Sequence, residues 1–132
     1  MADNEYTLKI LATAQAGGRM TERYELVIKR GSRHWVRNKT LHRRFGPAIE
    51  KNNASKKWFR CGKGHREDGP AVIYLSGSRA WKINGDMHRE DGPALIKNSY
   101  EAWYLLGELH RPNGLPAVTY FDSKRKEWWV SG

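Results

Sequence analysis

Short runs of β-branched and aromatic residues alternate with turn-forming residues along most of the chain. The clearest example is AVIYL at 71–75 and RAWKI at 79–83, which are separated by Ser-Gly-Ser at 76–78. Runs of this length and composition are typical of strands, and the small residues between them are typical of a tight turn. No stretch shows a helical period of comparable strength. The pattern therefore predicts an all-β fold built from β-hairpins.

The hairpin pattern recurs with a period of 23 residues. HREDGPA stands at 65–71 and again, identical, at 88–94, with weaker copies at 42–48 and 110–117. A tryptophan precedes each copy, and self-similarity at a fixed period is the signature of stacked repeat units. We predict one repeat domain, residues 1–132, folded as an antiparallel meander of hairpins or a short solenoid. Its parts are a degenerate unit at about 8–47, regular units at 48–70, 71–93 and 94–116, and a C-terminal half-unit at 117–132.

Two residue types in the repeat lead to local expectations. Asp-Gly within each HREDGPA heptad predicts a reverse turn with positive φ at Gly69 and Gly92, and the following proline suits the start of a strand. The tryptophan row, being periodic and in register, is expected to fill the interior of the sheet.

The Gly, aromatic and His-Gly-Pro pattern over about residues 25–132 resembles the MORN repeat, in its variant form with His-Arg-x-Asp-Gly-Pro-Ala signatures. Proteins with this variant are common in bacteriophages and large viruses. The resemblance therefore implies a phage or viral protein that acts on a host system, as an inhibitor in the host cytoplasm.

The repeated histidines and arginines invite a catalytic or metal-binding interpretation, because His65 with Asp68, or His88 with Asp91, could form an acid-base pair. An active site needs one constellation, however, whereas a residue that recurs in every hairpin is one that every hairpin needs. Equivalent positions on successive hairpins lie about 10 Å apart, too far for their histidines to share a zinc ion whose ligands lie about 2 Å away. We expect a ring hydrogen bond that ties the turn, and no catalytic residue, metal ligand or cofactor.

The charge is unevenly distributed along the chain. Lys and Arg number 24 against 14 Asp and Glu, a net charge of +10, and residues 1–71 carry +9 of it. The repeat itself does not require this asymmetry, because later units place neutral or acidic residues in the same positions. We predict an anion-binding surface on the first two hairpins, formed by Arg33, Arg37, Lys39, Arg43, Arg44, Lys57, Arg60 and Lys63.

Two classes of function follow. The first is a non-enzymatic binding protein that captures an anionic partner, which is a nucleic acid, a nucleotide signal or an acidic host protein. The alternative is a protein–protein interaction scaffold that uses the exposed sheet face, with the basic charge incidental. An enzyme that uses His34, His42 or His65 is the least supported class, because no nucleophile, base and orienting group converge.

The remaining features bound the setting. A lone cysteine, Cys61, suits a reducing compartment. The opening residues show no basic segment followed by a long apolar run, and no run of about 18 apolar residues occurs, so we expect a soluble, unprocessed cytoplasmic protein with no membrane partner. An edge strand at either end of the sheet can pair with a second copy, so a homodimer is a further expectation.

Overall fold

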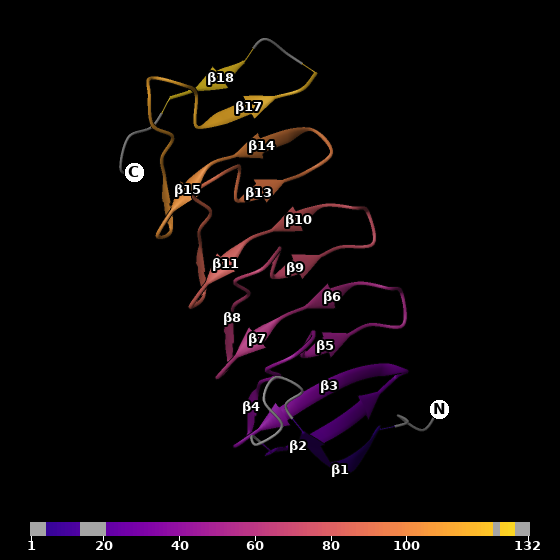
Figure 1. The fold of residues 1–132 in the computed structure, drawn as a ribbon. Coiled ribbons are helices and arrows are strands. Elements are labelled where there is room, and N and C mark those ends of the chain that lie inside the picture. The colour runs from indigo at the N-terminus through magenta and orange to yellow at the C-terminus, as the bar shows by residue number, and fades with distance from the viewer. Residues whose placement is uncertain (1–4, 14–20, 123–124, 129–132) are drawn as a thin grey trace. The chain divides into compact units, whose positions relative to one another are not determined.

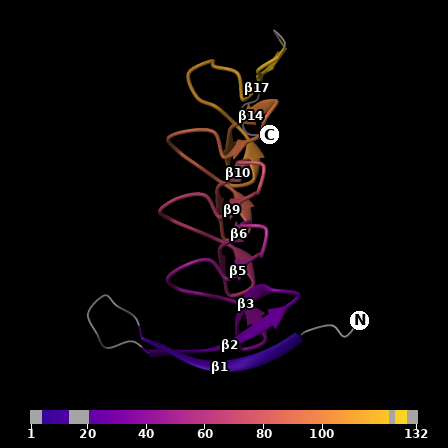
Figure 2. The ribbon, with the colours of Figure 1, turned by 90° about the vertical axis from the view of Figure 1, so that its right-hand side faces the viewer.

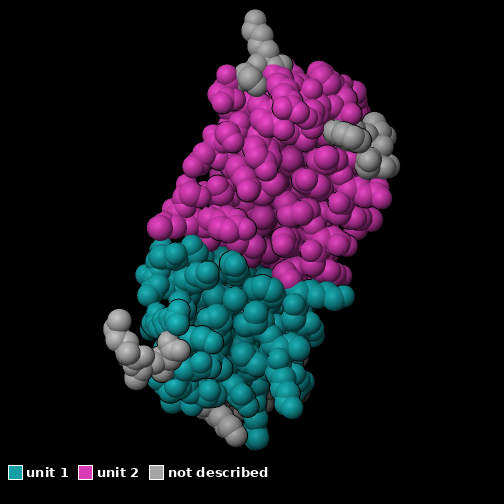
Figure 3. Space-filling view, turned by 180° about the vertical axis from the view of Figure 1, so that it is seen from behind, with its two compact units in different colours: residues 1–63 teal, residues 64–132 magenta. Residues whose placement is uncertain are grey.

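The computed structural model describes residues 5–13, 21–122 and 125–128, and the chain divides into two compact units, residues 1–63 and 64–132 (Figure 3). Every regular element in the described ranges is a strand, and all strand pairs are antiparallel, so the predicted all-β meander of hairpins is confirmed. No helix in the described ranges is long and apolar enough to cross a membrane.

The first unit is a meander with one long hairpin. Its sheet runs in the order β1–β2–β3–β5–β6, and β4 also pairs with β3 (Figure 1). The strands are β1 (Glu5–Thr13), β2 (Thr21–Lys29), β3 (Ser32–Arg37), β4 (Thr40–Leu41), β5 (Ile49–Glu50), β6 (Lys56–Lys57) and β7 (Phe59–Arg60), and β8 (Lys63–Gly64) lies at the unit boundary.

One face of this sheet carries the apolar core of the first unit. Leu26 of β2 stands opposite Trp35 of β3, and with Tyr24 they form a buried cluster against which Ile28 packs. Side chains on a strand alternate between faces, so the spacing of Tyr24, Leu26 and Ile28 places all three on one side.

The second unit repeats a short two-part motif (Figure 1). Its sheet runs in the order β9–β10–β13–β14–β17–β18, while β11–β12 and β15–β16 form separate two-stranded sheets. In Figure 2 the widest loops that join successive strands project from the same side. The strands are β9 (Val72–Ile73), β10 (Arg79–Ala80), β11 (Lys82–Ile83), β12 (Asp86–Met87), β13 (Leu95–Ile96), β14 (Tyr100–Ala102), β15 (Tyr104–Leu105), β16 (Glu108–Leu109), β17 (Val118–Tyr120) and β18 (Lys126–Glu127).

In the second unit, Trp81 and Trp103 each stand between a strand of the long sheet and a strand of a two-stranded sheet. The N–H of Trp81 donates to the carbonyl oxygen of Ala94 at 2.7 Å, and the carbonyl oxygen of Trp81 accepts from the N–H of His88 at 3.1 Å. Trp81 therefore ends the pairing of β10 and begins that of β11. The same two bonds recur at Trp35 and Trp103.

Alanine, rather than tryptophan, occupies the deepest positions. Ala71, Ala94 and Ala117, where the sequence places the unit boundaries, are 0% exposed. Trp35 is buried, but the expectation that the tryptophan row fills the interior is wrong for Trp58, Trp81 and Trp103, which are only half-buried.

Candidate anion-binding surface

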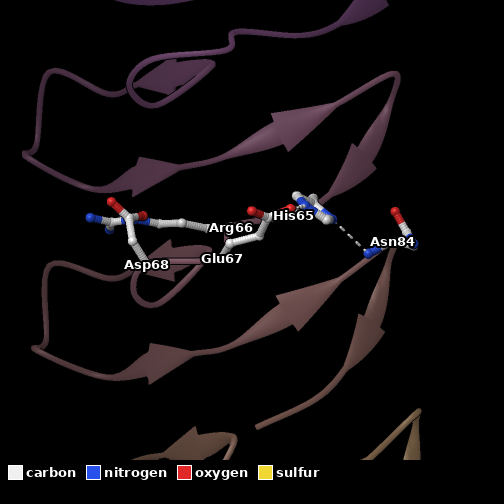
Figure 4. Close-up of polar contacts among 5 residues, drawn as sticks. All are labelled: His65, Arg66, Glu67, Asp68 and Asn84. Atoms are coloured by element: carbon white, nitrogen blue, oxygen red, sulfur yellow. Dashed lines mark hydrogen bonds and ion pairs between the residues drawn. The ribbon is translucent and has the colours of Figure 1, made fainter. Parts of the chain in front are cut away.

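The arginine of each heptad closes its own loop. Arg89 donates from Nη1 to the carbonyl oxygen of Pro93 at 3.2 Å and from Nε to Asp91 at 3.0 Å, and its Cζ lies 4.0 Å from the centre of the Trp81 ring. Arg66 makes the same two bonds, to the carbonyl oxygen of Pro70 at 3.1 Å and to Asp68 at 2.9 Å. Figure 4 shows Arg66 and Asp68. The bond from Arg66 also lowers the pKa of Asp68, with the guanidinium charge as the second cause.

In the two HREDGPA heptads the glycine serves this arginine rather than a turn with positive φ. Gly69 and Gly92 do not have positive φ, so the predicted Asp-Gly turn with positive φ is wrong for both. A Cβ at Gly92 would stand 2.7 Å from Cζ of Arg89, and one at Gly69 would stand 2.9 Å from Cζ of Arg66. Glycine is needed because the guanidinium group lies directly against its Cα.

The heptad histidine ties its repeat to the next one. Nδ1 of His65 accepts the backbone N–H of Asn84 at 3.0 Å (Figure 4), and Nδ1 of His88 accepts that of Leu106 at 3.0 Å. The expected ring bond is present, but it fixes the turn of the following hairpin. An Nδ1 that accepts a hydrogen bond carries no proton, so Nε2–H of His65 points to Glu67 Oε1, 3.3 Å away.

A groove of about 640 Å³ lies between the two identical heptads of the second unit. The sequence did not single it out, because no motif marks a space between two loops. Its lining includes Trp81 and Ile83 and the four carboxylates of Glu67, Asp68, Glu90 and Asp91. Its two guanidinium groups are already bonded to the loops, so an anion here would chiefly meet negative charge.

Arg43, one of the eight predicted anion-binding residues, is the loop-closing arginine of the first unit. Its Nη1 donates to the carbonyl oxygen of Pro47 at 3.1 Å and to Glu50 Oε1 at 3.0 Å, and its Cζ lies 3.9 Å from the centre of the Trp35 ring. These contacts match those of Arg89, so Arg43 has a structural role that competes with binding a ligand.

The remaining predicted residues divide between the two faces of the first unit. Arg33 and Arg37 alternate with Trp35 and therefore share its face. Lys57 stands opposite Ile49, which stands opposite His34, so Lys57 belongs to the other face. Lys39 lies in the β3–β4 turn, Arg44 in the first heptad loop, and Arg60 and Lys63 in β7 and β8, all exposed.

The His34 face carries more positive charge than the eight residues suggest. Burial lowers the pKa of His34, and the charges of Lys29 and then Lys51 lower it further, against an opposing effect of Glu5. Sequence reasoning left Lys29 and Lys51 out of the surface, and only the strand register brings them near His34.

Phe45 also belongs to the candidate surface. It is 53% exposed, and Cζ of Arg44 lies 5.7 Å from the centre of its ring. An exposed aromatic ring beside a guanidinium group is a combination that can stack on a base and bind a phosphate. The signal was visible in the sequence, since Phe45 replaces the aspartate of later heptads.

Within the described residues, no group of three or more His, Cys, Asp or Glu side chains is arranged to hold a metal ion. Comparison of the chain with protein-family models, curated proteins and solved structures finds no significant match. The resemblance to the variant MORN repeat therefore stays a prediction from the sequence.

Proposed function

We propose that this chain is a non-enzymatic binding protein that captures single-stranded nucleic acid on the exposed basic surface of residues 1–63. One observation carries the proposal: residues 1–63 hold 15 Lys and Arg against 5 Asp and Glu, whereas residues 64–132 hold 9 of each. The full net charge of +10 therefore lies in the first unit. Non-specific nucleic acid binding rests on such charge, through release of counterions from the phosphates.

Equivalent positions in the repeats make the contrast sharper. Two residues after the tryptophan stand Arg37 and Arg60 in the first unit, and Ile83 and Leu105 in the second. The third heptad position holds Arg44 in the first unit and glutamate in both HREDGPA copies, and the fourth holds Phe45 and then aspartate. The same scaffold thus accepts either charge, so its stability does not require the basic residues.

Phe45 favours nucleic acid over an acidic protein as the partner. Stacking on an aromatic side chain is independent of base sequence and contributes about 1–3 kcal/mol per base. With Arg44 beside it, the ring offers a base and its phosphate adjacent contacts. Capture without chemistry fits the heptad histidines, whose Nδ1 atoms are occupied by backbone N–H groups. A phage or viral inhibitor that sequesters a host nucleic acid or nucleotide signal is the biological form of this proposal.

The test transfers residues between equivalent positions. Arg44→Glu with Phe45→Asp installs the pair that stands at 67 and 68, and Arg60→Ile installs the residue at 83, so the scaffold accepts each change. Binding of a labelled single-stranded oligonucleotide is titrated over a range of salt concentrations. Each lost phosphate contact should reduce the slope of log K against log salt by about 0.7.

A matched control separates a local site from net charge. Lys97→Glu makes the same change of charge as Arg44→Glu, but on an exposed position of the second unit. It should leave affinity nearly unchanged at moderate salt, where exposed charges act over about 10 Å. Equal losses in both variants, or no loss in either, would contradict the proposed surface.

His34 reports on the location of the ligand. A phosphate bound near His34, Lys29 and Lys51 would stabilise the charged imidazole and raise the pKa of His34 from its lowered value. A ligand held only by Arg44 and Phe45 in the heptad loop, or by Arg33 and Arg37 on the Trp35 face, would leave the NMR titration of His34 unchanged. The experiment thus distinguishes the two basic faces.

A second candidate, the protein–protein scaffold, is favoured by the second unit. That unit is neutral and exposes large apolar side chains, among them Leu75, Leu106 and Phe121. Binding that depends on these residues and persists at high salt would support the scaffold, since apolar docking is not screened.

A further inference from the structure

The strand β1 is a long edge. It pairs with β2 over all nine of its residues, from Glu5 opposite Lys29 to Thr13 opposite Thr21, and with no other strand in the described part of the chain. Its sequence, EYTLKILAT, contains no Gly or Pro. An edge of this length without a proline is a template for pairing with another strand.

Apolar side chains on β1 are left partly uncovered. Tyr6 is 52% exposed and Leu8 is 48% exposed, although each belongs to the core face. Tyr6 stands opposite Ile28 and Leu8 opposite Leu26, a residue of the buried cluster. The row of apolar side chains on the core face therefore extends from β3 and β2 onto β1, the edge strand. A further strand paired with β1 would cover Tyr6 and Leu8.

We propose that β1 pairs antiparallel with β1 of a second copy of this chain, about a two-fold axis at Thr7. This register sets Tyr6 of each copy opposite Leu8 of the other, so two aromatic–aliphatic pairs form on the core face. Such pairs are favourable across strands.

The dimer responds to salt in the opposite direction to nucleic acid binding. Pairing brings together two units that each carry a net charge of +10, and this repulsion weakens as salt rises. Self-association should therefore strengthen, or hold, between about 50 mM and 500 mM salt, whereas capture of a polyanion weakens. The two proposals are independent, and the sign of the salt response tells their failures apart.

The first experiment measures mass against concentration by sedimentation, from about 5 to 500 µM protein. The unaltered chain should approach the dimer mass, and Tyr6→Lys with Leu8→Lys should weaken self-association at least about tenfold, because lysines on an edge strand oppose pairing. Arg79→Lys, on β10 of the second unit, is the control and should behave as the unaltered chain. A chain that stays monomeric throughout this range would overturn the proposal, as would a dimer that the lysine pair does not weaken.

Crosslinking tests the register without relying on the lysine variant. In a Cys61→Ser background, Thr7→Cys places the two new thiols opposite each other across the axis, within reach of a disulfide bond. Glu5→Cys is the matched control, because its two copies lie two residues from the axis on opposite sides and are therefore four residues apart along the strands, out of reach of a disulfide bond. Disulfide-linked dimer from Thr7→Cys but not from Glu5→Cys is the expected result. Equal crosslinking of both variants, or crosslinking of Glu5→Cys alone, would contradict this register.

Discussion

Gly92→Ala tests whether the heptad glycine exists for the arginine or for the backbone. The new Cβ would lie 2.7 Å from Cζ and 2.9 Å from Nε of Arg89, closer than carbon and nitrogen atoms pack. The guanidinium group must therefore move away from Trp81 and the carbonyl oxygen of Pro93. Because Gly92 does not have positive φ, the alanine itself meets no backbone strain.

The magnitude follows from the contacts that are lost. A guanidinium stacked on an aromatic ring contributes about 0.5–1 kcal/mol, and a hydrogen bond from a charged donor about 1.5 kcal/mol or more. The ion pair with Asp91, whose side chain is 86% exposed, adds little. Alanine recovers about 0.5 kcal/mol by restricting the unfolded chain. We expect a net destabilisation of about 2 kcal/mol.

A double-mutant cycle in urea provides the assay. In an Arg89→Ala background, Gly92→Ala should be neutral or slightly stabilising, since nothing remains for the Cβ to displace. Gly77→Ala is the comparison: Gly77 has φ +88° and open space around its Cβ position, so it should cost about 1 kcal/mol in either background. If Gly92→Ala costs as much without Arg89 as with it, the glycine is required by the backbone and the reasoning is refuted.

Three further predictions rest on single residues. Leu106 has φ +48°, is 73% exposed and occupies the turn position that holds Asn84 one repeat earlier. Asparagine tolerates positive φ better than leucine, so Leu106→Asn should raise the free energy of unfolding by about 0.5–1 kcal/mol. A lower free energy of unfolding would contradict this prediction. The pKa of Asp68 is lowered in the folded state, so its contribution is complete above its ordinary pKa of 3.8 and is lost as pH falls through the lowered value. Asp68→Asn should remove that part of the acid sensitivity, as measured by urea unfolding at several pH values. Nε of Arg111 is buried without a hydrogen-bond partner, whereas Nε of Arg66 and of Arg89 donates to an aspartate two residues later. Asn113→Asp restores that aspartate and should stabilise the last heptad, which would raise the urea midpoint of unfolding. An unchanged midpoint would show that the inserted Leu115 prevents the pairing.

The hairpins could be predicted from the sequence because they depend on local signals. The turn at 76–78 and the strands beside it follow from residue type and period. The burial of the alanines in place of the tryptophans did not follow, because the period alone does not show which repeated residue lies deepest. The requirement for a histidine ring bond could be inferred from repetition. The sequence could not show that the ring accepts a hydrogen bond from the next hairpin, because the donor is distant: the N–H that His65 accepts belongs to Asn84, 19 residues away.

The purpose of the heptad glycine and arginine could not be predicted for a related reason. Repetition shows that a residue is needed at each repeat and leaves the physical need open. For Gly92 the local explanation, a turn with positive φ, was available from the sequence and is wrong. The actual contact joins Arg89 to Trp81, eight residues earlier, and exists only once β11 and β12 have brought the two together.

The candidate surface was predicted as one patch because a linear sequence does not show strand faces. A shift of one residue along a strand moves a side chain to the other side of the sheet. Arg33 and Lys57 both belong to the basic N-terminal segment of the sequence, yet the strand register through β5 places their side chains on opposite faces of the sheet. The same register adds Lys29 and Lys51 around His34, which no count of charge along the chain would have grouped.

The repeat also separates positions that build the scaffold from positions that can change. His, Arg, Gly and Pro of the heptad, with the tryptophan before it, are engaged in bonds and contacts inside the repeat, so altering them costs stability before it alters binding. The third and fourth heptad positions, and the position five residues after the tryptophan, are exposed in every described repeat. They change from Arg44 and Phe45 to Glu and Asp, and from Lys63 to Asp86, while the bond from the heptad arginine to the proline carbonyl oxygen stays the same. A partner is therefore best sought with variants at these exposed positions, because loss of binding there cannot be mistaken for loss of the fold.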